Sequence, residues 1–172
     1  LLVGEFTNVE VNRVFLEKID GEYQGACFRF LDHFPSAVFR LCFGDDGSLY
    51  VGMTNRGWSS LGNRSYGLVR VRWNGETPFE IKEMRAKPDG FELVFTQPVD
   101  PTKASNVGSY RMNNYTYLYS GAYGSDELDK SENSITEATV STDRMSVYLK
   151  VNNLKAHYVH ELHAEGVLNR EG

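Results

Sequence analysis

The stretch from Asn55 to Tyr66 holds the residue types best suited to binding a small polar ligand. It is a polar, Gly-rich loop that contains one Trp and two Arg. Loops carry function more often than strands do, and an exposed Trp beside Arg and Asn suits stacking on a sugar ring. The candidate ligand-binding residues are Asn55, Arg56, Trp58, Arg64 and Tyr66. The favoured alternative is a structured loop whose Trp58 plugs the β unit below it, because burial of a Trp stabilises a small β unit.

Three histidines near the end of the chain, His157, His160 and His163, form the most conspicuous candidate for a metal site. The flanking pattern favours a strand, on which His157 and His163 share a face and His160 points away. With a rise of ~3.3 Å per residue, the outer two lie about 20 Å apart. One ion with Zn–N bonds of ~2 Å cannot join them. We expect solvent-facing strand histidines, no metal site and no catalytic residue.

Tyrosines crowd the region 110–123, and Tyr115, Tyr117 and Tyr119 alternate as they would on one face of a strand. An exposed Tyr stripe binds a glycan or a protein partner. The more common arrangement is a half-buried stripe with wet hydroxyls. The acidic segment 126–132 offers oxygens that calcium prefers, but it lacks the residue order of a calcium loop. It is predicted to be a solvated loop.

Composition places the chain among all-β proteins that do not bind nucleic acid. The aromatic content of 13% favours strands. A net charge of −5 leaves no basic stripe for phosphates. No apolar run approaches the ~20 residues that span a bilayer. The chain begins with Leu1-Leu2-Val3-Gly4 and no Met, which indicates a processed form or a fragment cut within a strand.

The two cysteines, Cys27 and Cys42, both lie in apolar, strand-like runs. Two buried free thiols that act as small apolar side chains are the favoured interpretation. A disulfide between neighbouring strands is the alternative.

Turn signals divide the chain near residues 76–84, so we predict two domains, 1–78 and 79–172. In the first, the segment Leu2-Val3-Gly4 resembles Tyr50-Val51-Gly52, at a spacing of 48 residues. Repeats of ~40–50 residues with about four strands each are typical of propeller blades. Strands are predicted at 12–18, 37–43, 49–53 and 67–73.

The second domain is predicted to be a β-sandwich of about seven short strands. The segment 90–96 alternates cleanly, with Phe91, Leu93 and Phe95 on one face. The other predicted strands are 110–112, 115–119, 135–140, 145–151 and 157–164. A single helical turn is considered only at 101–106.

Several motifs resemble known families. Asp46 to Gly52, followed by Thr54 to Trp58, is similar to the last blade of glucose/sorbosone-dehydrogenase-like β-propellers found in large secreted multidomain bacterial proteins. Gly21 to Cys27 and the stretch 66–73 strengthen this resemblance. Phe95 to Pro101 and Tyr158 to Val167 resemble bacterial immunoglobulin-like modules. The resemblance implies an all-β fold: a partial β-propeller (the last one to two blades) plus an immunoglobulin-like β-sandwich.

The resemblance also implies a function. We expect a non-catalytic C-terminal fragment of a secreted or periplasmic protein, with a structural or interaction role next to a sugar-dehydrogenase-like propeller. The alternative is a carbohydrate-binding part of a quinone-dependent sugar dehydrogenase. Some family members use pyrroloquinoline quinone and a calcium ion, which the resemblance allows for the parent protein. No residue of this chain is matched to their binding residues, so no cofactor is expected in the fragment. The expected partners are the remaining blades, a carbohydrate, and a second copy through open strand edges.

Overall fold

The structure, a computed structural model, describes residues 1–171. The chain forms two compact units, Leu1–Glu76 and Thr77–Gly172, here called the N-terminal and C-terminal units. They contain four small antiparallel sheets, and the helical parts of the described chain are single turns, α1 (Pro101–Ala104) and η1 (Val107–Ser109). The all-β class is confirmed. No helix in residues 1–171 has the length and apolar character needed to cross a bilayer.

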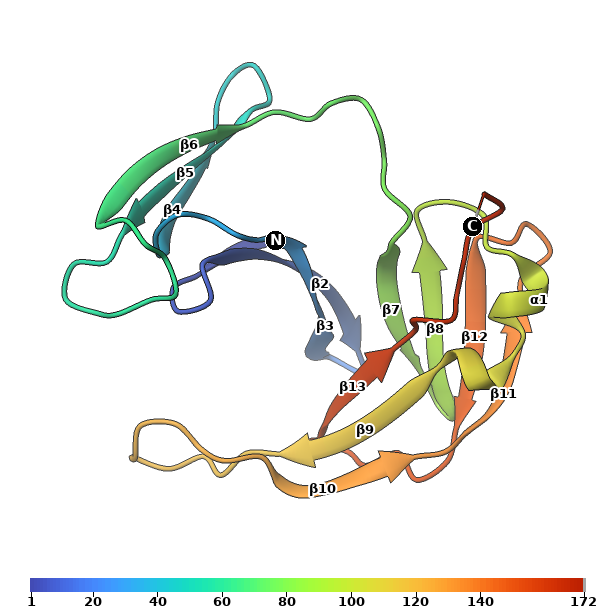
Figure 1. Cartoon of the computed structure of the whole chain (residues 1–172). Helices are drawn as coiled ribbons and strands as arrows, with labels where there is room; N and C mark the ends of the chain where they lie inside the picture. Colours follow the sequence, from blue (N-terminus) through green and yellow to red (C-terminus); the bar gives the residue numbers. More distant parts are fainter. Residues whose placement is uncertain (172) are drawn as a thin grey trace. The chain divides into compact units, whose positions relative to one another are not determined.

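The N-terminal unit consists of two three-stranded meanders (Figure 1). The first has the strand order β1-β2-β3 and the second β4-β5-β6. Their bounds are β1 (Leu2–Glu5), β2 (Glu10–Ile19), β3 (Glu22–Leu31), β4 (Val38–Phe43), β5 (Leu49–Thr54) and β6 (Tyr66–Val71). The turn between β2 and β3 is Asp20-Gly21, and both residues have the positive φ that a type I′ hairpin requires.

Alternation along β5 explains how the two meanders share one core. Leu49, Val51 and Met53 are buried. They pack with Val9, Val11 and Phe34 from the first meander and its connection to β4, and with Val38 at the start of β4. Neither sheet can bury its apolar face by itself. Gly4 lies where β1 meets β4, because a Cβ atom at this position would be 2.6 Å from Val38 Cγ1. Glycine therefore permits the close approach of these two strands.

The segments predicted to be equivalent lie at different places in their sheets. Val3 is in β1, the first strand of its meander, whereas Val51 is in β5, the middle strand of the next. Val51 is fully buried and Val3 is exposed. β1 and β5 would occupy the same position in their sheets only if a further strand paired with the free edge of β1.

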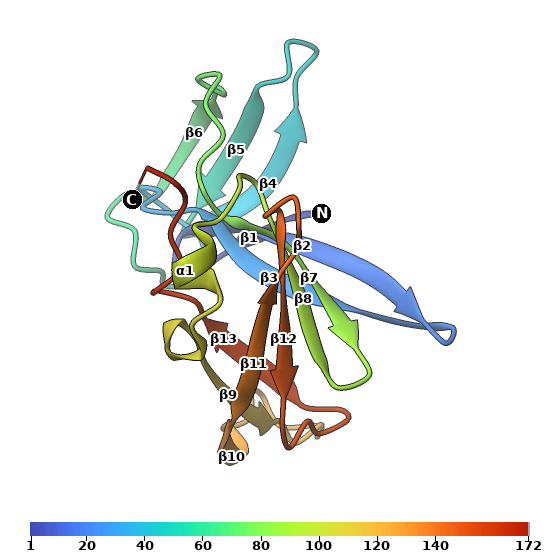
Figure 2. The ribbon, with the colours of Figure 1, turned by 90° about the vertical axis from the view of Figure 1, so that its right-hand side faces the viewer.

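In the C-terminal unit, a four-stranded sheet and a three-stranded sheet enclose a second core. The strand orders are β11-β12-β8-β7 and β10-β9-β13. In Figure 2 the strands of the four-stranded sheet lie side by side, and α1 lies near β11. The strands are β7 (Ile81–Lys87), β8 (Gly90–Phe95), β9 (Arg111–Thr116), β10 (Leu128–Asn133), β11 (Ile135–Val140), β12 (Ser146–Val151) and β13 (Val159–His163).

The core of this unit is built from alternate residues of its strands. Leu93 and Phe95 of β8 are buried with Val147 and Leu149 of β12, and Phe91 packs against the same cluster. The predicted face of Phe91, Leu93 and Phe95 is therefore confirmed. At the end of the core, the Asp100 side chain accepts from the Lys103 amide and caps α1.

Three local predictions are wrong. Residues 128–133 of the acidic segment form strand β10 instead of a solvated loop, because pairing with β9 satisfies their backbone despite poor strand propensity. The predicted Tyr stripe is broken, since β9 ends at Thr116 and Tyr117 and Tyr119 lie beyond it. Cys27 and Cys42 are free thiols, as in the favoured interpretation, but both are exposed instead of buried. The alternative, a disulfide between them, is not present.

Substituting the two glycines of the repeated motif should have opposite effects. Gly4→Ala would drive a methyl into buried Val38, so we expect a loss of about 1–3 kcal/mol in the free energy of unfolding. At Gly52 the nearest atom to a new Cβ is Arg40 Cβ at 3.6 Å. Gly52→Ala should leave stability unchanged or raise it by up to about 1 kcal/mol, because Ala loses less backbone entropy. Urea unfolding of both variants checks this, and equal effects would contradict it.

Candidate functional site

The loop between β5 and β6 is organised around the side chain of Asn55. Its Oδ1 accepts hydrogen bonds from the Ser36 hydroxyl at 3.1 Å, the Ala37 amide at 3.1 Å and the Ser60 hydroxyl at 2.6 Å. Its Nδ2 donates to the Arg64 carbonyl at 2.9 Å. One amide side chain thus joins both ends of the loop to the connection before β4. The loop is structured, as the alternative interpretation of this segment predicted.

Backbone contacts fix the same loop to neighbouring segments. The Leu61 amide donates to the Thr7 carbonyl at 2.8 Å and the Arg64 amide to the Pro35 carbonyl at 2.9 Å. Gly62 lies close beneath these contacts, because a Cβ there would be 2.7 Å from the Pro35 carbonyl oxygen. Residues 61–64 are therefore held as one wall against the segment that precedes β4.

A polar pocket of about 590 Å³ lies between this wall and the first meander. The start of β2 contributes Glu10, β3 contributes Arg29, and the connection to β4 contributes Asp32 and His33. The apolar part of the lining comes from Val9, Phe34, Pro35 and Leu61. Polar groups beside an apolar wall are the usual composition of a small-molecule site.

Charged groups in the pocket form a chain of pairs. Arg29 Nε lies 3.0 Å from Glu10 Oε2, and Arg29 Nη1 lies 3.8 Å from Asp32 Oδ2. Asp32 Oδ1 contacts His33 Nδ1 at 2.7 Å. The Glu10 carboxylate is largely buried, whereas Arg29 and His33 are exposed to the pocket mouth. The two carboxylates balance Arg29 and Arg64, so the lining is close to neutral when His33 is uncharged.

This donor set suits a polyhydroxy ligand better than a metal ion. Both carboxylates are engaged by Arg29, and calcium requires several free oxygen ligands. In residues 1–171, no group of three or more His, Cys, Asp or Glu side chains is placed to hold an ion. Guanidinium and carboxylate groups side by side donate to and accept from hydroxyls.

The five predicted binding residues do not form one site. Arg64 lines the pocket, and Asn55 acts behind it by holding the loop. Arg56 is exposed, and its amide donates to Thr54 Oγ1 at 3.1 Å. Trp58 is 55% exposed, so it does not plug the sheet below. Tyr66 begins β6 and is 78% exposed on the outer side of its sheet.

Sequence reasoning missed Glu10, Arg29, Asp32 and His33. They meet because β2 pairs with β3 and a register shift occurs between Val11 and Asn12. Such a shift leaves no signal in the residue types themselves. Asn55 was singled out as a ligand-binding residue, but its loop contacts could not be read from the sequence.

The three C-terminal histidines differ from the prediction in two ways. β13 begins at Val159, so His157 lies in the preceding turn and shares no strand face with His163. His160 faces the core, where its ring lies 5.6 Å from the ring of Phe91. Its Nε2 is buried and has no hydrogen-bond partner among the described residues. Burial lowers the pKa of His160, and its bond to the Tyr158 backbone opposes the shift only in part.

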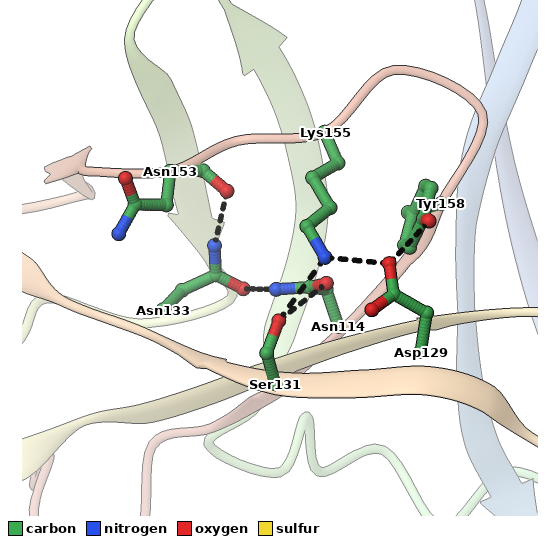
Figure 3. A network of polar contacts seen from close by, with 7 residues as sticks. All are labelled: Asn114, Asp129, Ser131, Asn133, Asn153, Lys155 and Tyr158. Carbon is green, nitrogen blue, oxygen red and sulfur yellow. Dashed lines mark hydrogen bonds and ion pairs between the residues drawn. The ribbon is translucent and has the colours of Figure 1, made fainter.

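A network of buried amides is the second polar cluster of the chain (Figure 3). Asn114, which is fully buried, donates through Nδ2 to Asn133 Oδ1 at 2.7 Å and accepts from the Ser131 hydroxyl at 3.1 Å. Asn133 Nδ2 donates to the carbonyl groups of Asn152 and Asn153 at 3.2 and 3.0 Å. These bonds join β9 and β10 to the loop before β13, so their role is structural.

Charged groups continue the network at the surface. Lys155 Nζ lies 2.9 Å from Asp129 Oδ2, and the Tyr158 hydroxyl donates to the same oxygen at 2.6 Å (Figure 3). The hydrogen bond from Tyr158 and the nearby Lys155 hold the pKa of Asp129 below its usual range. The same carboxylate raises the pKa of Tyr158. The polar groups of this cluster hydrogen-bond to one another, so the cluster is a weaker candidate for ligand binding than the pocket.

Comparison with protein-family models, with curated proteins and with solved structures finds no match to this chain.

His160 should make the C-terminal unit sensitive to acid. Because the folded-state pKa lies below the value of about 6.5 in an unfolded chain, stability is fully present above that value and is lost as the pH falls through the folded pKa. His160→Leu should remove this part of the loss between pH 7.5 and 5, as measured by thermal unfolding. His163→Leu, on the opposite face of β13, is the control. Identical pH profiles for wild type and His160→Leu would contradict the assignment.

Proposed function

We propose that the chain is a non-catalytic interaction module, in which the N-terminal unit supplies two neighbouring sheets of a β-propeller and the C-terminal unit is an immunoglobulin-like sandwich. Its role is to brace a sugar-dehydrogenase-like propeller and present it to partners. The resemblance of its motifs supports a secreted or periplasmic bacterial protein.

One observation carries the propeller part of this proposal. The similar segments lie in β1 and β5, and β5 is the second strand of its sheet. If one strand paired with the free edge of β1, β1 would also become a second strand. The two meanders would then be successive copies of one unit, in agreement with the 48-residue spacing of the similar segments.

Strand order supports the sandwich part of the proposal. β11-β12-β8-β7 corresponds to strands D-E-B-A of an immunoglobulin-like domain, and β10-β9-β13 corresponds to C′-C-F. Tyr158 precedes β13 as the tyrosine corner precedes strand F, but its hydroxyl binds the Asp129 side chain instead of the backbone. This difference from the immunoglobulin pattern affects one hydrogen bond and leaves the strand order unchanged.

The non-catalytic role predicts no turnover by this chain. Addition of pyrroloquinoline quinone and calcium to the 172-residue protein should give no dye-linked oxidation of glucose or other aldoses above a quinone-only control. The physical reason is that the pocket carboxylates are already engaged by Arg29 and are poorly placed to serve as bases or calcium ligands. Sustained, protein-dependent dye reduction would contradict the proposal.

Carbohydrate binding is a second candidate function, and the pocket favours it. A nearly neutral lining with paired guanidinium and carboxylate groups and one apolar wall matches the hydroxyls and the C–H face of a sugar. The candidate sugar-binding site is therefore the pocket that Arg64 lines, and not the surface around Trp58.

Calorimetry with a panel of neutral mono- and oligosaccharides tests this candidate. Arg64→Ala should weaken binding about tenfold, the effect of losing one charge-assisted hydrogen bond. Tyr66→Ala is the matched control, because Tyr66 is exposed outside the pocket lining. Flat traces with every sugar, or equal losses for both variants, would exclude the pocket as a sugar site.

A further inference from the structure

Strand β6 presents an unpaired edge whose hydrogen-bonding groups can be assigned residue by residue. The Asn55 amide donates to the Ser65 carbonyl at 2.9 Å, directly before the strand. Antiparallel pairing alternates along a ladder, and Thr54 is opposite Tyr66. The backbone groups of Gly67 and Val69 therefore point to β5. Those of Tyr66, Leu68 and Arg70 point to the free edge.

Most other edge strands of the described chain carry features that discourage pairing. Register shifts interrupt the pairing of β3, β4, β7, β10 and β11 with their neighbours, and such bulges protect edges. β7 and β10 also carry charged side chains along their length, and β1 has only four residues. β6 and β13 both keep an unbroken register, but β13 is shorter and carries polar and charged side chains at three of its five positions, His160, Glu161 and His163.

The side chains of β6 are unusually apolar for an exposed edge. Leu68 is 72% exposed and Tyr66 78% exposed, and both lie on the outer face of the sheet with Arg70. Arg70 is drawn toward β5 by an ion pair with Asp46 and a hydrogen bond from its Nε to Ser48 Oγ at 2.9 Å. It therefore leaves the edge accessible. A regular edge with exposed apolar side chains is a template for another strand.

We propose that two copies of this chain pair antiparallel through β6, about a two-fold axis at Leu68. Leu68 then faces the partner's Leu68, and Tyr66 faces the partner's Arg70. All three outward-pointing residues are used in this register, which forms about six backbone hydrogen bonds between the copies. The proposal goes beyond the proposed function and does not depend on it.

Geometry leaves few other registers for a two-fold pair. Residues whose backbone groups point to the free edge must lie opposite residues of the partner whose backbone groups do the same. The register can therefore shift only in steps that keep these residues opposite one another. The next register places Leu68 opposite the partner's Arg70 and uses only two outward residues of β6. Shifts beyond these two registers overlap fewer strand residues, and one of them opposes Arg70 to the partner's Arg70.

The sequence of the edge is complementary to itself, which is why we assign a second copy as the occupant. A two-fold interface must match its own surface. Here an apolar side chain meets its own copy at the axis. On either side the Tyr66 ring lies opposite the aliphatic stem of the partner's Arg70, whose guanidinium stays with Asp46, and this is an apolar cross-strand contact.

Sedimentation velocity over a micromolar concentration series tests the proposal with the 172-residue chain. We expect a reversible monomer–dimer equilibrium, weakened at least about tenfold by Leu68→Lys, because two ammonium groups would face each other at the axis. Leu118→Lys is the matched control, since Leu118 is 63% exposed in the C-terminal unit, and it should leave the equilibrium unchanged. Circular dichroism should show both variants folded. A strict monomer, or a dimer indifferent to Leu68→Lys, would overturn the proposal.

Amide hydrogen exchange locates the interface independently. Amides of Tyr66, Leu68 and Arg70 should become protected as concentration rises, whereas Val69, which is bonded to β5, should be protected at every concentration. Concentration-dependent protection at β1 or β13 instead of β6 would show that a different edge pairs, and the assignment would fail. Protection at β6 without any change in mass would equally exclude a dimer.

Discussion

Both units depend on one constraint: a small sheet has an apolar face that it cannot bury alone, so two sheets must come close enough to share a core. In the N-terminal unit, the two sheets approach closely where β1 meets β4. Gly4 provides the space beside buried Val38. In the C-terminal unit, Gly90 allows a close approach within one sheet, because a Cβ there would be 1.8 Å from the Leu149 carbonyl oxygen on the adjacent strand β12. The core between the two sheets of this unit consists of packed apolar side chains such as Leu93, Leu149 and Met112.

Much of the fold is visible in the sequence because burial imposes a period of two. Leu49, Val51 and Met53, like Leu93 and Phe95, alternate in the sequence and are buried in the structure. Strands that lack this signal were missed. β10 is polar apart from Leu128 and forms because it pairs with β9, and β7 contains a register shift that breaks its alternation. Pairing partners, and not propensity, decide such edge strands.

The candidate site was only partly predictable for a related reason. Arg64 stood out because Arg, Trp and Asn gather in one Gly-rich loop, a pattern visible along the chain. Glu10, Arg29 and His33 belong to different segments, and a shift in the β2–β3 register brings them together. Residue types indicate what chemistry a side chain can perform. They do not indicate which residues of other strands will lie beside it in the fold.

The contacts of Asn55 fix the backbone path of its loop independently of which side chains the loop exposes. Because one half-buried amide and a few backbone groups fix the path of the chain, exposed side chains such as Arg56 and Asn63 are not needed to maintain it. Substitutions at such positions can accumulate over evolution at little structural cost. The segment is thus a fixed backbone frame whose exposed side chains can change without altering its path.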